Sequence, residues 1–128
     1  MRNAILFVLF IVSFSCKQSS NTTPDIHLIS PQEMTDLLMM EEVQLIDVRT
    51  PKEFEGGAIA NAKNINFLSD DFESKIEKLD KDKPICVYCK KGGRSAKAAK
   101  RLKEIGFKKI YDLEGGITNW EDTNKKGK

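Results

Sequence analysis

The chain has 128 residues, of which 40% are hydrophobic and 31% charged, and its formal net charge at pH 7 is only +2. This length and composition fit one small globular domain that can bury a core without disulfide staples. They exclude collagen, coiled coils and multi-pass membrane proteins, and the near balance of charges removes any compositional argument for nucleic-acid binding.

The first fifteen residues have the features of a secretory signal peptide. A short positive start precedes a nearly unbroken apolar run, Ala4 to Phe14, which is too short to span a bilayer. The run ends at Ser15 and is followed directly by Cys16, an arrangement that resembles a bacterial lipoprotein cleavage site. We therefore expect a lipid on Cys16 that anchors the protein to a membrane, on the periplasmic or outer side of a bacterial cell envelope. A plain signal peptide is the alternative.

The remaining chain divides into a tether, one domain and a tail. Residues 16–26 are rich in Ser, Thr and Asn and predict a flexible tether. Residues 27–122 are predicted to form the folded domain, and residues 123–128 a basic, disordered tail. The single histidine, His27, cannot by itself form a metal site or a Cys-His pair, so we expect no metal.

From Ile26 onward, segments typical of strands alternate with segments typical of helices, which predicts an α/β domain around a mainly parallel sheet. A capping box at 30–33 opens the first helix. In chain order we predict a helix at 30–40, a strand at 43–48, a short helix from 50 that ends at 56–57, a strand at 63–67, a helix at 70–79, a strand at 84–89, a helix at 95–105 and a strand at 110–113.

The segment after the strand at 84–89 is the chemically suggestive one. Cys89 ends that strand, and ligands of open parallel sheets bind beyond the carboxyl ends of the strands. The loop that follows combines glycines with basic residues: Lys90, Lys91, Gly92, Gly93 and Arg94. Glycines let several backbone N–H groups point inward as an anion-binding nest, and the next helix adds its dipole. These features favour the thiolate of Cys89, which we predict to be a nucleophile for anionic substrates.

Three motifs together resemble the rhodanese-like sulfurtransferases. Residues 89–95 (Cys-Lys-Lys-Gly-Gly-Arg-Ser) resemble the family's active loop, which begins with the catalytic Cys and closes with Arg-Ser ahead of a helix. Residues 45–49 with Glu53-Phe54, and residues 113–117 with Trp120, resemble two further signatures in the family's order. The resemblance covers about residues 28–121. It implies a rhodanese-like fold, in which helices flank both faces of a mainly parallel sheet of about five strands.

One segment departs from the family pattern. Residues 57–62 read Gly-Ala-Ile-Ala-Asn-Ala, where members usually read Gly-His-Ile-Pro-Gly-Ala. The departure concerns the rigidity of a turn and not the chemistry, because neither missing residue carries the sulfur.

The resemblance implies a double displacement without metal or organic cofactor. Cys89 would take the outer sulfur of thiosulfate or a related donor, release sulfite, and pass the sulfur from a persulfide to cyanide or a thiol. The loop amides from Lys90 to Ser95 would hold the negative charge, and Arg94 with Lys90 or Lys91 would attract the donor. The partners of the protein would be a small anionic sulfur donor and a thiol acceptor, with no nucleic acid. We expect the protein to be a monomer.

Two groups of basic residues carry open alternatives. Arg49 either lies at the active edge of the sheet, where it would bind substrate, or forms a salt bridge to Glu53. The helix at 95–105 has a basic face, which is typical of a solvated surface but could recruit an acidic partner or lipid head groups. That face consists of Lys97, Lys100, Arg101 and Lys103.

Three other functions compete with sulfur transfer. A thiol oxidoreductase would use Cys86 and Cys89, but on one strand their Cα atoms would be about 10 Å apart, too far for a disulfide; Cys86 is predicted to be a buried core residue. A non-catalytic rhodanese-like binding module would be expected to lack the cysteine. A phosphatase or arsenate reductase on the same fold would have five residues between Cys and Arg, whereas this loop has four between Cys89 and Arg94.

Overall fold

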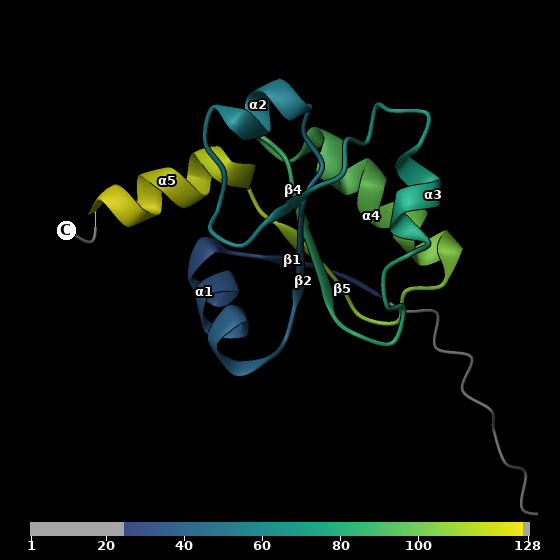
Figure 1. Cartoon of the computed structure of the whole chain (residues 1–128). Helices are drawn as coiled ribbons and strands as arrows, with labels where there is room; N and C mark the ends of the chain where they lie inside the picture. Colours follow the sequence, from purple (N-terminus) through teal and green to yellow (C-terminus); the bar gives the residue numbers. More distant parts are fainter. Residues whose placement is uncertain (1–24, 127–128) are drawn as a thin grey trace, which may run out of the picture.

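The computed structural model describes residues 25–126, which form a five-stranded sheet with helices on both sides (Figure 1). The strands are β1 (Ile26–Ile29), β2 (Gln44–Asp47), β3 (Lys63–Asn64), β4 (Ile85–Tyr88) and β5 (Ile110–Leu113). The helices are α1 (Pro31–Met40), α2 (Pro51–Glu55), α3 (Phe72–Ile76), α4 (Gly93–Ile105) and α5 (Gly116–Lys126). The strand order is β1-β5-β4-β2-β3, and every pairing is parallel.

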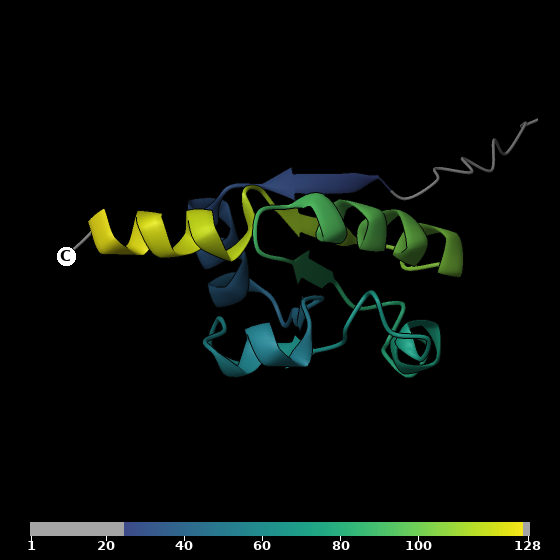
Figure 2. The same cartoon turned by 90° about the horizontal axis from the view of Figure 1, so that it is seen from above.

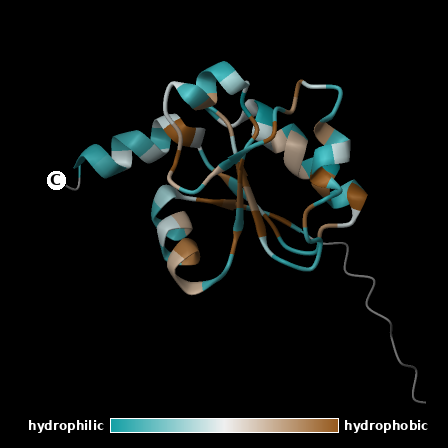
Figure 3. Ribbon diagram, viewed as in Figure 1, coloured by the Kyte–Doolittle hydropathy of each residue, from teal (hydrophilic) through white to brown (hydrophobic). Residues whose placement is uncertain are grey.

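Alternate residues of the central strand pack on opposite faces of the sheet. Ile85 and Val87 belong to the core layer that includes α3 and α4, whereas Cys86 and Tyr88 belong to the layer that includes α1 and α5. All four residues of β4 are buried, as expected for a strand covered on both faces. Figure 3 shows hydrophobic residues along the central strands and α5 as largely hydrophilic. The predicted α/β architecture, with a mainly parallel sheet and helices on both faces, is confirmed.

The first helix forms where its capping box predicted it. Ser30 Oγ accepts a hydrogen bond from the Glu33 amide at 3.2 Å, and Glu33 Oε2 accepts one from the Ser30 amide at 2.7 Å. Pro31 occupies the first helical position, where its missing N–H has no cost. The helix ends at Met40, as predicted.

Several predicted boundaries are wrong by a few residues. Strand β3 covers only 63–64 instead of 63–67, and α3 covers 72–76 instead of 70–79. Helix α4 begins two residues earlier than predicted, at Gly93, because the Ala96 amide already donates to the Gly92 carbonyl at 3.1 Å.

Helix α5 was not predicted, and it includes residues 123–126 of the expected tail. Ile117 and Trp120, three residues apart, share the face that packs against the core layer of α1. Lys125 and Lys126 lie in its last turn, where positive charge interacts favourably with the helix dipole. Seen from above, α5 extends away from the molecule at the end toward which the β1 arrow points (Figure 2).

The loop after α2, residues 57–62, folds without the residues that the family usually has there. Asn61 adopts a φ of 66°, at the position where the family usually carries glycine. Asparagine tolerates this left-handed conformation better than most residues with a side chain. The loop is also fixed to the sheet, because the amide of buried Ile59 donates to the Tyr88 hydroxyl at 3.1 Å.

The predicted signal peptide at 1–15, Cys16 and most of the tether lie outside the described residues. Within 25–126, no helix is both long and apolar enough to cross a bilayer.

Candidate active site

Cys89 lies immediately beyond β4, at the carboxyl edge of the sheet, with the neighbouring strands β2 and β5 on either side. Its side chain belongs to the core layer of α3 and α4 and is 1% exposed. Cys86, three residues earlier, belongs to the opposite layer, and the two thiols are free. The prediction that Cys86 is a buried core residue is therefore confirmed.

The loop after Cys89 folds back over its sulfur. The Gly92 amide donates to Cys89 Sγ at 3.1 Å, and Ser95 Oγ lies 3.6 Å from the same atom. Ser95 is fully buried, and its hydroxyl donates to the Gly92 carbonyl at 3.2 Å. Gly92 has a φ of +114°, a conformation that residues with a side chain rarely adopt, so this close turn requires glycine.

The environment of Cys89 has opposing effects on its pKa. Burial raises the pKa of the thiol, but hydrogen bonds from the amides of Ser95, Gly92 and Lys91, together with the hydrogen bond between the sulfur and the Ser95 side chain, outweigh burial. The net effect lowers the pKa of Cys89 below its ordinary value, which increases the thiolate fraction at neutral pH.

The loop is held from outside by the start of α5. The Ile117 amide donates to the Cys89 carbonyl at 2.9 Å, and the Thr118 amide donates to the Lys90 carbonyl at 3.1 Å. A Cβ on Gly116 would lie 2.5 Å from each of these two carbonyl oxygens, so only glycine permits the approach. The sequence identified Gly116 through a family signature but did not reveal this role, because the two segments are far apart in the chain.

Arg94 is paired in this structure with a carboxylate from α2. Its Nη1 and Nη2 donate to Glu53 Oε1 and Oε2 at 2.7 and 2.9 Å. The Arg94 hydrogen bonds are the main reason that the pKa of Glu53 falls to about 2, and the Thr50 hydroxyl, which donates to Oε1 at 3.1 Å, contributes. The guanidinium therefore lies at the pocket with its charge already balanced.

Of the two alternatives left open for Arg49, the salt bridge to Glu53 does not form. Arg49 pairs instead with fully buried Asp47, with N···O distances of 2.7–3.0 Å, and also donates to the Gly57 carbonyl at 2.7 Å. Its guanidinium carbon lies 5.9 Å from the centroid of the Tyr88 ring. Arg49 is thus at the carboxyl edge of the sheet, but its donors fix the turn after α2. The spacing Asp-x-Arg could have suggested this pairing, because residues i and i+2 of an extended strand lie on one face.

A further carboxyl group lies behind Ser95. Asp112, on β5, is 4% exposed, and its Oδ1 is the one buried side-chain oxygen or nitrogen of residues 25–126 without a hydrogen-bond partner. Burial raises the pKa of Asp112, and the Ser95 side chain partly offsets the effect. The sequence signal for this residue was an acid within an otherwise apolar strand.

A pocket of about 400 Å³ opens beside the loop. Five of the predicted site residues line it: Cys89, Lys90, Lys91, Gly93 and Arg94. Lys97, which was not predicted, completes the lining. Gly92 and Ser95 contact the sulfur from outside this lining, and Arg49 is not part of it. Lys90, Lys91 and Lys97 form no salt bridge with the residues that the structure describes. Between Asp25 and Lys126, no group of three or more His, Cys, Asp or Glu side chains is placed to hold a metal ion.

The comparison with known proteins agrees with this geometry. Residues 30–123 match the family model of the rhodanese-like domain. The chain belongs to the rhodanese-like family. It is 37% identical over 93 residues to the thiosulfate sulfurtransferase GlpE of Coxiella burnetii, a match that covers 73% of this chain and 85% of that protein.

Two other proteins have a comparable sequence identity to this chain. An uncharacterized protein of Bacillus subtilis, YqhL, is 42% identical over 79 residues, which cover 62% of this chain and 61% of YqhL. The crystal structure of a rhodanese-related protein from Thermoplasma volcanium superposes with a TM-score of 0.67 at 33% identity, covering 76% of this chain and 92% of that one. The chain thus spans less than two thirds of YqhL but most of the other two proteins.

We predict that Gly116→Ala destabilises the protein by at least about 2 kcal/mol, because the new methyl group would collide with the loop carbonyls and the φ of +62° disfavours alanine. Urea unfolding measures this loss. Gly93→Ala is the matched control, since no atom lies within 4 Å of its Cβ position, and its stability should change by less than about 1 kcal/mol. Equal losses in the two variants would contradict the contact.

We also predict that the two cysteines differ in reactivity with pH. Burial raises the pKa of Cys86 to about 12, whereas the pKa of Cys89 is lowered. Iodoacetamide reacts with thiolates. In the folded protein at neutral pH, Cys89 should therefore be alkylated long before Cys86. Mass spectrometry of peptides, with fragmentation to separate the two sites, follows both reactions. If the alkylation rate of Cys89 rises only when the pH exceeds the ordinary pKa of a free thiol, the lowered pKa is contradicted.

Proposed function

We propose that this protein transfers a sulfane sulfur from thiosulfate or a related donor, through a persulfide on Cys89, to cyanide or a thiol. The observation that carries the proposal is the Cys89 sulfur itself, surrounded by amide donors beside a pocket whose three lysines form no salt bridge with residues 25–126. The similarity to thiosulfate sulfurtransferases supports the same reaction.

In the first step the Cys89 thiolate attacks the outer sulfur of thiosulfate. A bond forms between Sγ and that sulfur, the sulfur–sulfur bond of the donor breaks, and its electron pair leaves with sulfite. Two negative charges enter with the donor and two leave with sulfite, so the persulfide carries the charge that the thiolate had. The amides of Lys91, Gly92 and Ser95 that favour the thiolate are suited to stabilise this persulfide anion.

Attraction of the donor falls mainly to the lysines. Arg94 was expected to attract the dianion, but both of its terminal nitrogens are bound to Glu53. Lys90, Lys91 and Lys97 line the same pocket without a salt bridge to any described residue. Three ammonium groups around one small pocket raise the local concentration of an anionic substrate.

The phosphatase and arsenate reductase alternatives have less support at this site. Four residues separate Cys89 from Arg94, which leaves a smaller ring of amides than the family's phosphatases have. Cleavage of a phosphate ester also needs a general acid, and the pocket lining contains no Asp, Glu or His. The single histidine, His27, lies on β1, which is separated from β4 by β5.

The experiment that tests the proposal is intact-mass analysis after exposure to thiosulfate. The wild type should gain one sulfur, which cyanide then removes. Cys89→Ser should gain none, because a hydroxyl is a poor nucleophile toward sulfur at neutral pH, whereas Cys86→Ala should load normally and lose only stability.

Two outcomes would contradict this function. Equal loss of loading in well-folded Cys89→Ser and Cys86→Ala variants would favour a dithiol mechanism. Hydrolysis of an aryl phosphate that depends on Cys89, in a protein that forms no persulfide, would favour the phosphatase.

We also propose that the protein acts at a bacterial cell envelope, held by a lipid on Cys16. The support comes from the sequence, in which the apolar run ends at this cysteine and a tether follows. The wild type should fractionate with membranes, and Cys16→Ser should remain unprocessed or become soluble. Soluble secretion of the wild type after cleavage beyond Cys16 would refute the anchor.

A further inference from the structure

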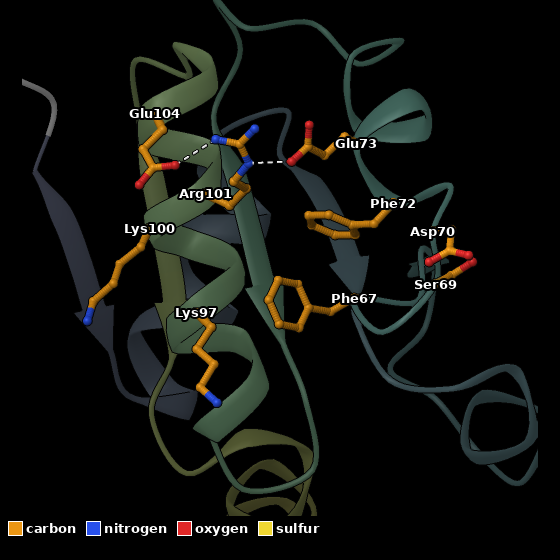
Figure 4. Close-up of a pocket in the computed structure, with 9 residues that line it drawn as sticks. All are labelled: Phe67, Ser69, Asp70, Phe72, Glu73, Lys97, Lys100, Arg101 and Glu104. Atoms are coloured by element: carbon orange, nitrogen blue, oxygen red, sulfur yellow. Dashed lines mark hydrogen bonds and ion pairs between the residues drawn. The ribbon is translucent and has the colours of Figure 1, made fainter.

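Helix α4 has two flanks that differ in charge. On the flank toward α3, Arg101 is bound to two carboxylates, so its charge is balanced (Figure 4). Figure 4 shows Lys100 on the side of the helix opposite to Phe67 and Phe72. Lys103 shares the flank of Lys100, because residues i and i+3 of a helix are neighbours. Neither lysine forms a salt bridge with residues 25–126, so within the described chain this flank keeps two positive charges.

Strand β1 lies beside the flank that carries Lys100 and Lys103. It forms one edge of the sheet, next to β5, and α4 lies against it. Ile26 packs on the core layer of α4, and Leu28 projects from the same face of the sheet because it is two residues farther along the strand. Leu28 is nevertheless 61% exposed, so a large apolar side chain is open to solvent on this side of the molecule. We call the surface formed by Leu28, Lys100 and Lys103 the β1–α4 face.

The β1–α4 face reaches the end of the domain to which the predicted tether is joined. The start of β1 and the end of α4 lie at the same end of the molecule in both Figure 1 and Figure 2. Nine residues separate Cys16 from Ile26, and they can span at most about 32 Å. A lipid on Cys16, as proposed above, would therefore keep this end of the domain close to the membrane.

The chemistry of the β1–α4 face fits a phospholipid surface. Ammonium groups near a membrane are attracted by anionic lipids, and an apolar side chain enters the boundary between the headgroups and the acyl chains. The anchor adds to this attraction, because a tethered face meets the headgroups at a high effective concentration. An acidic protein would attract the same lysines, but the anchor of the chain brings this face to lipid.

We propose that the β1–α4 face lies on a surface of anionic phospholipids, with Lys100 and Lys103 at the headgroup phosphates and Leu28 inserted between the headgroups. The proposal rests on the lipid anchor proposed above and adds a fixed orientation of the domain on the membrane. The pocket beside Cys89 is lined by neither of these lysines, so the lysines of that pocket stay available to a substrate.

Hydroxyl-radical oxidation of the full-length lipoprotein on vesicles tests this orientation. The protein is added to preformed vesicles of phosphatidylcholine, with or without 30% phosphatidylglycerol, and mass spectrometry measures the oxidation of Leu28. Met39 and Met40 are the internal reference, because they are 82% and 80% exposed at the end of α1, on the opposite face of the sheet from α4. Leu28 should be oxidised at least about threefold more slowly on the anionic vesicles, and high salt should remove the difference.

Paired variants identify the charges that hold the face. The double variant Lys100→Gln, Lys103→Gln should lose the protection of Leu28. Lys63→Gln is the matched control, because it removes an exposed charge from β3, the strand at the other edge of the sheet, and it should keep the protection. All variants should accept sulfur from thiosulfate as the wild type does, since neither the face nor Lys63 belongs to the pocket at Cys89.

Three results would overturn the proposed orientation while the anchor stands. They are equal oxidation of Leu28 on the two kinds of vesicle, loss of protection in Lys63→Gln, and full protection in the double variant. Protection of Leu28 in native membranes but not on anionic vesicles would identify an acidic protein as the partner instead of lipid. The mass of the peptide that contains Cys16 tests the anchor separately, and a wild type without lipid there overturns the anchor and the orientation with it.

Discussion

The hydrogen bonds between the start of α5 and the loop after Cys89 determine what this site can do. A peptide unit is planar and its C=O and N–H point in opposite directions. When the Thr118 amide holds the Lys90 carbonyl outward, the Lys91 amide of the same peptide unit must point inward, toward the sulfur. The lowered pKa of Cys89 therefore depends on a helix more than 25 residues later in the chain. Gly116 is needed there because any side chain would separate the two segments.

Two kinds of charge lie near the site: the ion pair between Arg94 and Glu53, and the lysines that line the pocket. Arg94 and Glu53 connect α4 to α2, and each is about one quarter to one third exposed, so solvent weakens their attraction. Their pairing nevertheless fixes both side chains at the edge of the pocket. The pocket lysines, which pair with no residue that the structure describes, then supply positive charge that can move toward an anion, since an ammonium group on a flexible stem needs no fixed geometry. Small anions of different shape can bind to such a site.

Features encoded by contiguous residues could be predicted from the sequence, and features that depend on distant partners could not. The capping box of α1, the strand at 110–113 and the glycine-rich loop after Cys89 each lie within a few residues. The ion pair of Glu53, by contrast, joins residues 41 positions apart. Nothing near Glu53 in the sequence distinguishes its actual partner, Arg94, from the nearer candidate, Arg49. Helix α5 was missed for another reason: it begins at a Gly-Gly pair, a sequence that more often ends a helix, and its polar composition leaves only one short apolar stripe.

Asp112 shows how a carboxyl group can lie behind a thiolate without cancelling the effect of the amides. A negative charge at Asp112 would repel the Cys89 thiolate across Ser95 and raise the pKa of the thiol. Burial raises the pKa of Asp112, because the ionised form loses its hydration, and the Ser95 side chain partly offsets this effect. Ser95 lies between the Asp112 carboxyl group and the sulfur, and its hydroxyl donates to the Gly92 carbonyl. Because Ser95, Gly92 and Lys91 also direct their amides at the sulfur, the pKa of Cys89 stays below its ordinary value despite the nearby acid.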